Sequence, residues 1–194
     1  MTSPRPYTKT RRAELEQQTR ERITEAAVDL HGSLGPAQTT ISAIAQRADV
    51  QRATVYRHFP DEESLFAACS AHWVAHNEPP DLAAWAAIRD PADRLAVALS
   101  ELYAWYGRTQ RMLELLIRDL SVVPSLQTQF RLPAYLDAAA DVLLAGRPER
   151  GAARRRARAA LGHAVAFETW LSLVRQQGLT SAEAITLMAR MSAR

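Results

Sequence analysis

Polar side chains that can contact nucleic acid lie close together between residues 51 and 59. This segment carries two arginines, Arg52 and Arg57, and three further hydrogen-bond donors, Thr54, Tyr56 and His58. An arginine near the start of a helix in the major groove can donate to both O6 and N7 of guanine. Hydroxyl and imidazole groups are donors that position a protein on phosphate. The segment is therefore a candidate for contacting double-stranded DNA.

Apolar spacing predicts two short helices that would hold these side chains. A hydroxyl of Thr39 or Thr40 can cap the first helix. Val55 and Phe59, four residues apart, would turn the second helix inward, and Pro60 would end it. The first helix would bury four further apolar residues, Ile41, Ile44, Ala45 and Ala48. The pair predicts a helix-turn-helix. Periodicity alone also fits ordinary surface residues of a helical hairpin, and leaves both interpretations open.

The segment TTISAIAQRADVQRATVYRHFPDEESLF resembles the signature of the tetracycline-repressor (TetR) family of regulators, most specifically in Thr-Val-Tyr-Arg-His-Phe. The resemblance covers about residues 18–70. It implies a three-helix DNA-binding head, a homodimer, and a C-terminal body of about six helices that usually binds a small molecule. It also implies roles for individual residues. Thr40 would cap a helix and touch phosphate, and Ser42 would lie near the groove. The expected base contacts are Arg52, Ala53 and Arg57, the expected phosphate contacts are Thr54, Tyr56 and His58, and Phe59 would close the core of the head.

Three residues depart from the family pattern. Gln51 replaces the small hydroxylated residue that usually caps the third helix, so we expect a weaker or different cap. Asp49 replaces a turn glycine, and aspartate tolerates the left-handed conformation better than most residues. Glu62 stands where the family often has a lysine. Because the run Asp61-Glu62-Glu63 would repel DNA, Glu62 is not expected to contact it.

Composition restricts the class of protein. The chain has 194 residues, of which 47% are hydrophobic and 23% charged, as in a folded globular protein. No apolar run reaches the roughly 20 residues that cross a bilayer, and the charged N-terminus does not fit a signal peptide, so we expect a cytoplasmic protein without membrane contact. Cys69 is the only cysteine and is expected to be buried. A basic arm over residues 1–15 carries Arg5, Lys9, Arg11 and Arg12, and fits either phosphate binding or a solvated tail.

Helical periodicity along the whole chain predicts an all-α fold of about nine helices. One apolar stripe, formed by Ile23, Ala26, Ala27, Leu30 and Leu34, predicts the first helix. Later helices are predicted over residues 92–108, 111–123, 133–145, 152–177 and 181–191. We expect a DNA-binding domain over 1–70 and an effector-binding and dimerisation domain over 71–194.

Two sets of residues are candidates for the roles of the C-terminal domain. By resemblance, the last two helices would form the dimer interface, through Leu161, Val165, Leu171, Val174, Ile185 and Met188. The alternative is that these stripes pack within one chain. Polar and aromatic residues that could line an effector pocket are Tyr103, Tyr106, His163, Phe167, Glu168 and Trp170. The alternative for the aromatic residues is a plain core.

No catalytic motif is recognisable, so the sequence predicts neither an enzyme nor a cofactor. His72 and His76 lie four residues apart but lack further ligands, and no metal site is predicted. The run Arg154-Arg155-Arg156 with Arg158 fits a solvated helix start better than a second nucleic-acid patch. We expect a repressor that binds a palindromic operator as a homodimer and is released by a small molecule. The alternatives are a regulator whose body docks a protein partner, and activation in place of repression.

Overall fold

The computed structural model describes residues 6–192, with side chains from Arg11 onward, and these residues form helices and no strand. This confirms the all-α prediction. The chain divides into two compact units: unit 1 holds residues up to 77 and 111–129, and unit 2 holds residues 78–110 and those from 130 on. No described helix is long and apolar enough to cross a membrane. The functional boundary at residue 70 stays a prediction.

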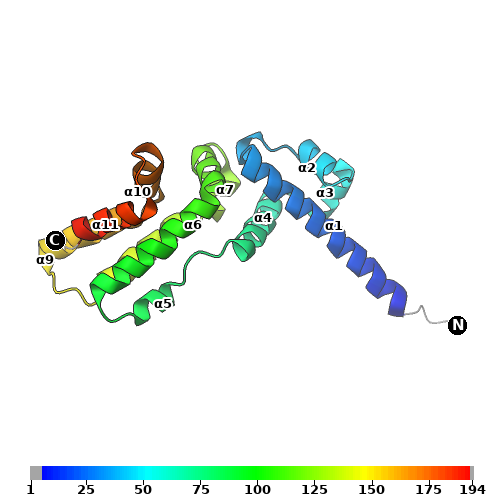
Figure 1. Ribbon diagram of the computed structural model, residues 1–194. Coiled ribbons are helices and arrows are strands. Elements are labelled where there is room, and N and C mark those ends of the chain that lie inside the picture. The colour runs from blue at the N-terminus through cyan, green and yellow to red at the C-terminus, as the bar shows by residue number, and fades with distance from the viewer. Residues whose placement is uncertain (1–5, 193–194) are drawn as a thin grey trace. The chain divides into compact units, whose positions relative to one another are not determined.

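Unit 1 is built from five helices and the end of a sixth (Figure 1). Their bounds are α1 Pro6–Ser33, α2 Ile41–Arg47, α3 Arg52–His58, α4 Glu62–His76, α7 Pro124–Gln129 and the part of α6 (Pro91–Asp119) from Arg111 on, with a 3₁₀ turn at Pro36–Gln38. The α1 helix packs on α2 and α4, and α4 packs on α7. Burial of apolar side chains from α1 to α4 forms one core.

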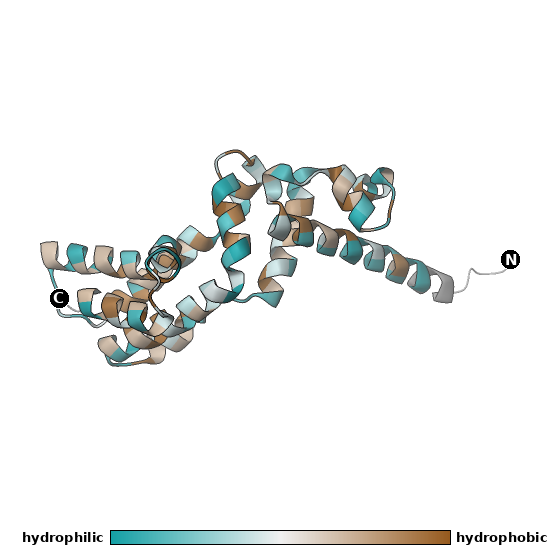
Figure 2. Cartoon of the chain, turned by 45° about the horizontal axis from the view of Figure 1, so that its top comes forward, coloured by the Kyte–Doolittle hydropathy of each residue, from teal (hydrophilic) through white to brown (hydrophobic). Residues whose placement is uncertain are grey.

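The first helix is longer than its apolar stripe. Ile23, Ala26 and Ala27 are buried, but Leu34 lies beyond the helix end and is 42% exposed, so its predicted place in the stripe is wrong. Figure 2 shows mainly hydrophilic residues along the part of α1 nearest the N-terminus. The predicted basic arm falls partly there. Arg5 and the side chain of Lys9 lie outside the described residues, and Arg12 pairs with Glu16 at 3.2 Å on the surface.

Unit 2 holds α5 Leu82–Ala87, the part of α6 up to Gln110, α8 Leu132–Leu144, α9 Gly151–Val165, α10 Phe167–Trp170, a π-helical segment Leu171–Gln176 and α11 Ser181–Ser192. The α8 helix packs on α5 and α9, and α11 packs on α9. Thr180 and Glu183 form a capping box before α11: the Thr180 N–H donates to Glu183 Oε2 at 2.8 Å, and the Glu183 N–H donates to Thr180 Oγ1 at 3.3 Å.

Two predicted helix boundaries are wrong. Residues 92–108 and 111–123 were expected to form separate helices, but α6 runs unbroken to Asp119. A glycine inside a helix costs only about 1 kcal/mol relative to alanine, so Gly107 does not end it. The predicted single helix 152–177 is instead interrupted at Ala166, whose ψ is 140°. The hydroxyls of Tyr103 and Tyr106 donate to the oxygens of Ala164 and Val165 there, at 2.9 and 2.6 Å, and satisfy carbonyls at the end of α9.

Candidate nucleic-acid interface

The turn between α2 and α3 has the geometry that its sequence predicts. Thr40 caps α2, with its Oγ1 accepting a hydrogen bond from the Ala43 N–H at 3.1 Å. Asp49 adopts a φ of 52°, which confirms the expected left-handed turn residue. The N–H of Val50 then donates to the Ala45 oxygen at 2.9 Å, which closes the turn. This sharp turn brings α3 against α2 and fixes which of its faces is buried.

One face of α3 is buried and the other is exposed. Val55 is fully buried, and Phe59, just after the helix, is 2% exposed. The predicted contact residues lie on the other side: Ser42 of α2 and Arg52, Ala53, Tyr56 and Arg57 of α3 are exposed, as is Thr40, whereas Thr54 and His58 are half-buried. Gln51 occupies the N-cap position with no side-chain cap hydrogen bond, as its departure from the family pattern predicts.

Arg52 and Arg57 are the chemically significant pair on this face. Neither guanidinium has an ion-pair or hydrogen-bond partner among the described side chains. An exposed helix of seven residues with two unpaired cations on its surface suits a polyanion, since both phosphate oxygens and guanine edges accept from arginine.

Arg20 of α1 holds the C-terminal end of α3 and was missed by sequence reasoning. Its Nη1 donates to the His58 oxygen at 2.6 Å, and its guanidinium lies 4.0 Å from the centre of the Phe59 ring. It satisfies a carbonyl at the helix end and adds a cation–π contact. Its partner lies 38 positions away in the chain, so no local pattern signals it.

His58 differs from an ordinary surface histidine. Burial, and then the positive charges of Arg57 and Arg20, lower its pKa below the usual value of 6.5. Its Nε2 is buried and has no hydrogen-bond partner in the described structure. The lowered pKa favours the neutral imidazole, and Nε2 is covered by the protein in this structure, so the phosphate contact of His58 stays a prediction.

The acidic residues at the start of α4 form hydrogen bonds within unit 1. Asp61 caps the helix, with Oδ1 accepting from the Ser64 N–H at 2.7 Å, and this hydrogen bond lowers the pKa of the carboxyl group. Glu62 Oε1 accepts from the Ser125 hydroxyl at 3.1 Å, which ties α4 to α7. Further along α4, Cys69 is 3% exposed, and burial raises its thiol pKa to about 12.

The predicted effector residues fall into two groups in unit 2. Tyr103, Tyr106, Phe167 and Trp170 are at most 2% exposed, and the Tyr106 ring lies 5.2 Å from Phe167 and 5.8 Å from Trp170. The two polar candidates are exposed: His163, which lies 3.3 Å from the Thr169 hydroxyl, and Glu168. The aromatic residues therefore form a packed cluster whose tyrosine hydroxyls are already engaged.

The predicted dimer residues are also divided. Leu161 and Val165 are fully buried and Met188 is 4% exposed, so these three have almost no surface to offer a partner. Leu171, Val174 and Ile185 are half-buried. Large apolar side chains that sequence reasoning did not select, Leu187 and Met191 of α11, are 38% and 59% exposed.

Arg158 of the arginine run and the pair His72 and His76 have local partners. Arg158 pairs with Asp141 at 2.8 Å and Asp137 at 3.5 Å, which leaves it on the surface of α9. His72 and His76 stack at 4.4 Å, and His76 Nδ1 lies 2.8 Å from the His72 oxygen. Among the described residues, no group of three or more candidate ligands is arranged to hold a metal ion.

Comparisons with known proteins agree with this geometry. Residues 23–69 match the family described as "Bacterial regulatory proteins, tetR family". A TetR-family transcriptional regulator from Streptomyces coelicolor has a similar fold, with a TM-score of 0.62 and 19% identity over 91% of this chain and 79% of that one. So has the TetR-family repressor FadR of Thermus thermophilus, solved with lauroyl-CoA, with a TM-score of 0.57 and 22% identity over 90% of this chain and 93% of that one. No curated protein sequence matched the chain.

Proposed function

Residues 23–69 belong to the tetR family of bacterial regulatory proteins, and from this premise we propose that the chain represses transcription by binding a palindromic operator as a homodimer. The exposed, unpaired Arg52 and Arg57 of α3 carry the proposal. Two copies of α3 would enter successive major grooves, about 34 Å apart. Arg52, Ala53 and Arg57 would face bases, and Thr40, Ser42, Thr54 and Tyr56 would lie along the phosphates. Such a role places the protein in the cytoplasm.

Operator binding is tested by selecting a DNA site from a random library and titrating it by fluorescence anisotropy. Arg52→Ala and Arg57→Ala should each weaken binding by about 1–3 kcal/mol and relax preference at one base pair. Arg108→Ala, which removes an exposed arginine from α6, is the matched control and should bind normally. Unchanged affinity in both α3 variants would refute the groove assignment.

The dimer proposal rests on the C-terminal helices of unit 2. Leu187 and Met191, one turn apart on α11, expose apolar surface, and the half-buried Leu171, Val174 and Ile185 could extend it. Glutamates at Leu187 and Met191 would put charges into that interface. The double variant should sediment as a monomer and lose operator affinity, while Val97→Glu on α6 should stay dimeric. If the double variant is still a dimer, the interface does not include Leu187 and Met191.

The proposed effector is a small molecule bound in unit 2. Support comes from the fold shared with the Thermus thermophilus repressor, whose structure contains lauroyl-CoA. His163 and Glu168 are the exposed polar groups beside the aromatic cluster that such a ligand could reach. Lauroyl-CoA is the first probe for thermal shift, with CoA as its control. Binding of this effector would release operator DNA if the coupling free energy between effector binding and DNA binding is about 1–3 kcal/mol.

A second function is favoured by the packing of the aromatic cluster. Tyr103 and Tyr106 donate to backbone carbonyls, their rings contact one another, and the Tyr106 ring also packs on Phe167 and Trp170. A core that is filled by these aromatic side chains would suit a C-terminal domain that docks a protein partner. Acyl-CoA titrations in which neither the melting temperature nor DNA affinity changes, across several chain lengths, would favour that alternative.

A further inference from the structure

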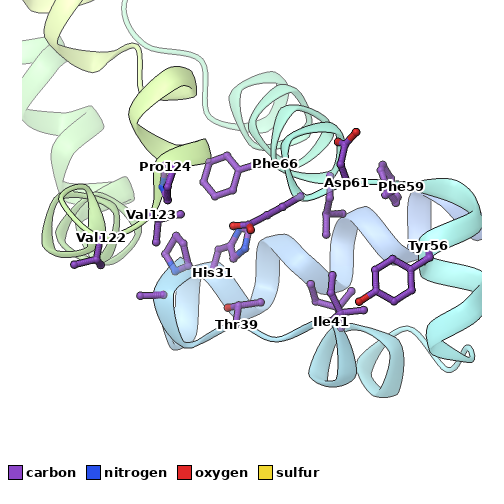
Figure 3. A pocket seen from close by; sticks show the side chains of 15 residues that line it. His31, Thr39, Ile41, Tyr56, Phe59, Asp61, Phe66, Val122, Val123 and Pro124 are labelled. Atoms are coloured by element: carbon purple, nitrogen blue, oxygen red, sulfur yellow. The ribbon is translucent and has the colours of Figure 1, made fainter.

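Unit 1 contains a cavity of about 600 Å³ (Figure 3). Of the residues proposed to bind the operator or the effector, only Tyr56 lines it. Its walls come from the end of α1, from α2, α3 and α4, and from residues 122–124, all within unit 1. Pockets that hold small molecules commonly have volumes of about 300–1,000 Å³. The cavity is therefore large enough for an organic ligand.

The floor and the mouth of the cavity differ in chemistry. Apolar side chains that are at most 7% exposed form the floor: Ile44, Phe59, Leu65, Phe66 and Val123. Three exposed polar side chains, Tyr56, Asp61 and Glu62, line it nearer the solvent. The lining includes no lysine or arginine. The Asp61 carboxylate points away from the other labelled side chains, so Glu62 supplies the carboxylate of the lining beside this apolar surface (Figure 3).

His31 adds a polar group to the wall. The residue is 8% exposed, its ring lies 5.2 Å from that of Phe66, and neither ring nitrogen has a hydrogen-bond partner among the described residues. Burial lowers its pKa to about 4 in spite of the nearby Asp119, so the ring is neutral at pH 7. His31 is part of the cavity lining, so a molecule in the cavity can reach its ring. A ligand with a donor or an acceptor could supply that hydrogen-bond partner.

We infer that the cavity binds a small organic cation with an apolar body. The cationic group would lie at Glu62, whose hydrogen bond from Ser125 leaves further acceptor positions free on the carboxylate. The body would cover the apolar floor. A negative ligand is disfavoured by the same carboxylate, since no positive lining residue compensates it.

Two probes of matched shape and opposite charge test this inference on the full chain. Tetraphenylphosphonium should bind in isothermal titration calorimetry, and tetraphenylborate should bind at least about tenfold more weakly. The titration contains no DNA, so its outcome is independent of operator binding, and the variants below distinguish this cavity from an effector site in unit 2. Equal binding of both ions, or no binding of the cation, would overturn the inference.

Two pairs of variants locate the bound cation. Glu62→Gln should weaken binding roughly two- to fivefold, as expected for loss of an exposed ion pair, whereas Glu63→Gln, outside the lining, should not. Val122→Trp should block the cavity, because Val122 lines it and is 66% exposed, so the larger ring can be accommodated without unfolding. Val74→Trp is its control, and thermal melts check the fold of each. Binding that persists unchanged in folded Val122→Trp would place the cation elsewhere and refute the site.

Discussion

Asp119 binds Ala37 through a hydrogen bond of 3.0 Å, from the backbone N–H of Ala37 to Oδ2 of the carboxylate. This contact joins the end of α6 to the 3₁₀ turn that follows α1. Arg118 pairs with the same carboxylate at 2.7 Å, which lowers the pKa of Asp119, and also donates to the Leu34 oxygen at 2.8 Å. The path from α1 to α2 is thus held by two adjacent residues of α6.

Gly35→Ala should disrupt this junction. Gly35 has a φ of +94°, and a Cβ there would collide with the side chains of Arg118 and Asp119. We expect a loss of about 1–3 kcal/mol in the free energy of unfolding, measured by urea denaturation. Gly107→Ala is the control, because Gly107 lies within α6 with open space around it and alanine favours helix. A Gly35→Ala variant as stable as the parent would show that the junction is not tightly fixed.

His31 should make stability depend on pH. Its pKa is about 4 in the folded chain and 6.5 as a free side chain, so the unfolded chain takes up the proton first as the pH falls. Protonation of His31 therefore does not affect the free energy of unfolding above pH 6.5. Between pH 6.5 and about 4 it lowers that free energy as the pH falls, at a slope of up to about 1.4 kcal/mol per pH unit. Urea titrations of His31→Gln across this range should show a shallower slope.

The exposed His76 on α4 provides the comparison for that experiment. His76→Gln should retain the slope of the parent chain between pH 6.5 and 4. Parallel curves for the parent and His31→Gln would mean that His31 is not the group that titrates in this window.

Gln51→Ser should stabilise the chain. Gln51 occupies the N-cap position of α3 with extended backbone angles but no side-chain hydrogen bond, and serine caps well in that conformation. A gain of about 0.5–1 kcal/mol is expected in thermal or chemical unfolding. Thr40→Ala, which removes the existing cap of α2, should cost about 1 kcal/mol in the same assay. Equal stability of Gln51→Ser and the parent would indicate that the first turn of α3 cannot accept a serine cap.

Tyr106→Phe should destabilise unit 2 without creating a cavity. It removes the hydroxyl that donates to the Val165 oxygen at 2.6 Å and leaves that buried carbonyl unpaired. A cost of about 1–3 kcal/mol in unfolding free energy is expected. Tyr56→Phe, at a side chain that is 48% exposed, should change stability by less than about 0.5 kcal/mol. Similar values for the two variants would argue against a structural role for the Tyr106 hydroxyl.

The features that could be predicted from sequence depend on neighbouring residues. The spacing of Val55 and Phe59 predicts the buried face of α3, and the identity of Asp49 predicts a left-handed turn, because both effects act within a few residues. The capping role of Thr40 follows in the same way. The exposure of Arg52 and Arg57 follows from the same periodicity.

The features that could not be predicted depend on distant contacts. The interruption at Ala166 has neither glycine nor proline to announce it, and the tyrosines that satisfy the freed carbonyls lie about sixty positions earlier. Arg20 reaches His58 across 38 positions. Likewise, a stripe such as Leu161 and Val165 shows that a helix face is apolar, but does not show whether the same chain or a partner covers it.

The discontinuity of unit 1 in the chain affects the order in which it can fold during synthesis. Residues up to 77 emerge from the ribosome well before residues 111–129, which supply Asp119 to Ala37 and Val123 to the cavity wall. At roughly 5–20 residues per second, the nascent DNA-binding helices wait seconds for these partners. During that interval the Phe66 side of α4 lacks its cover from α7. The protein therefore passes through a stage in which a chaperone could bind the same apolar surface that later forms the cavity floor.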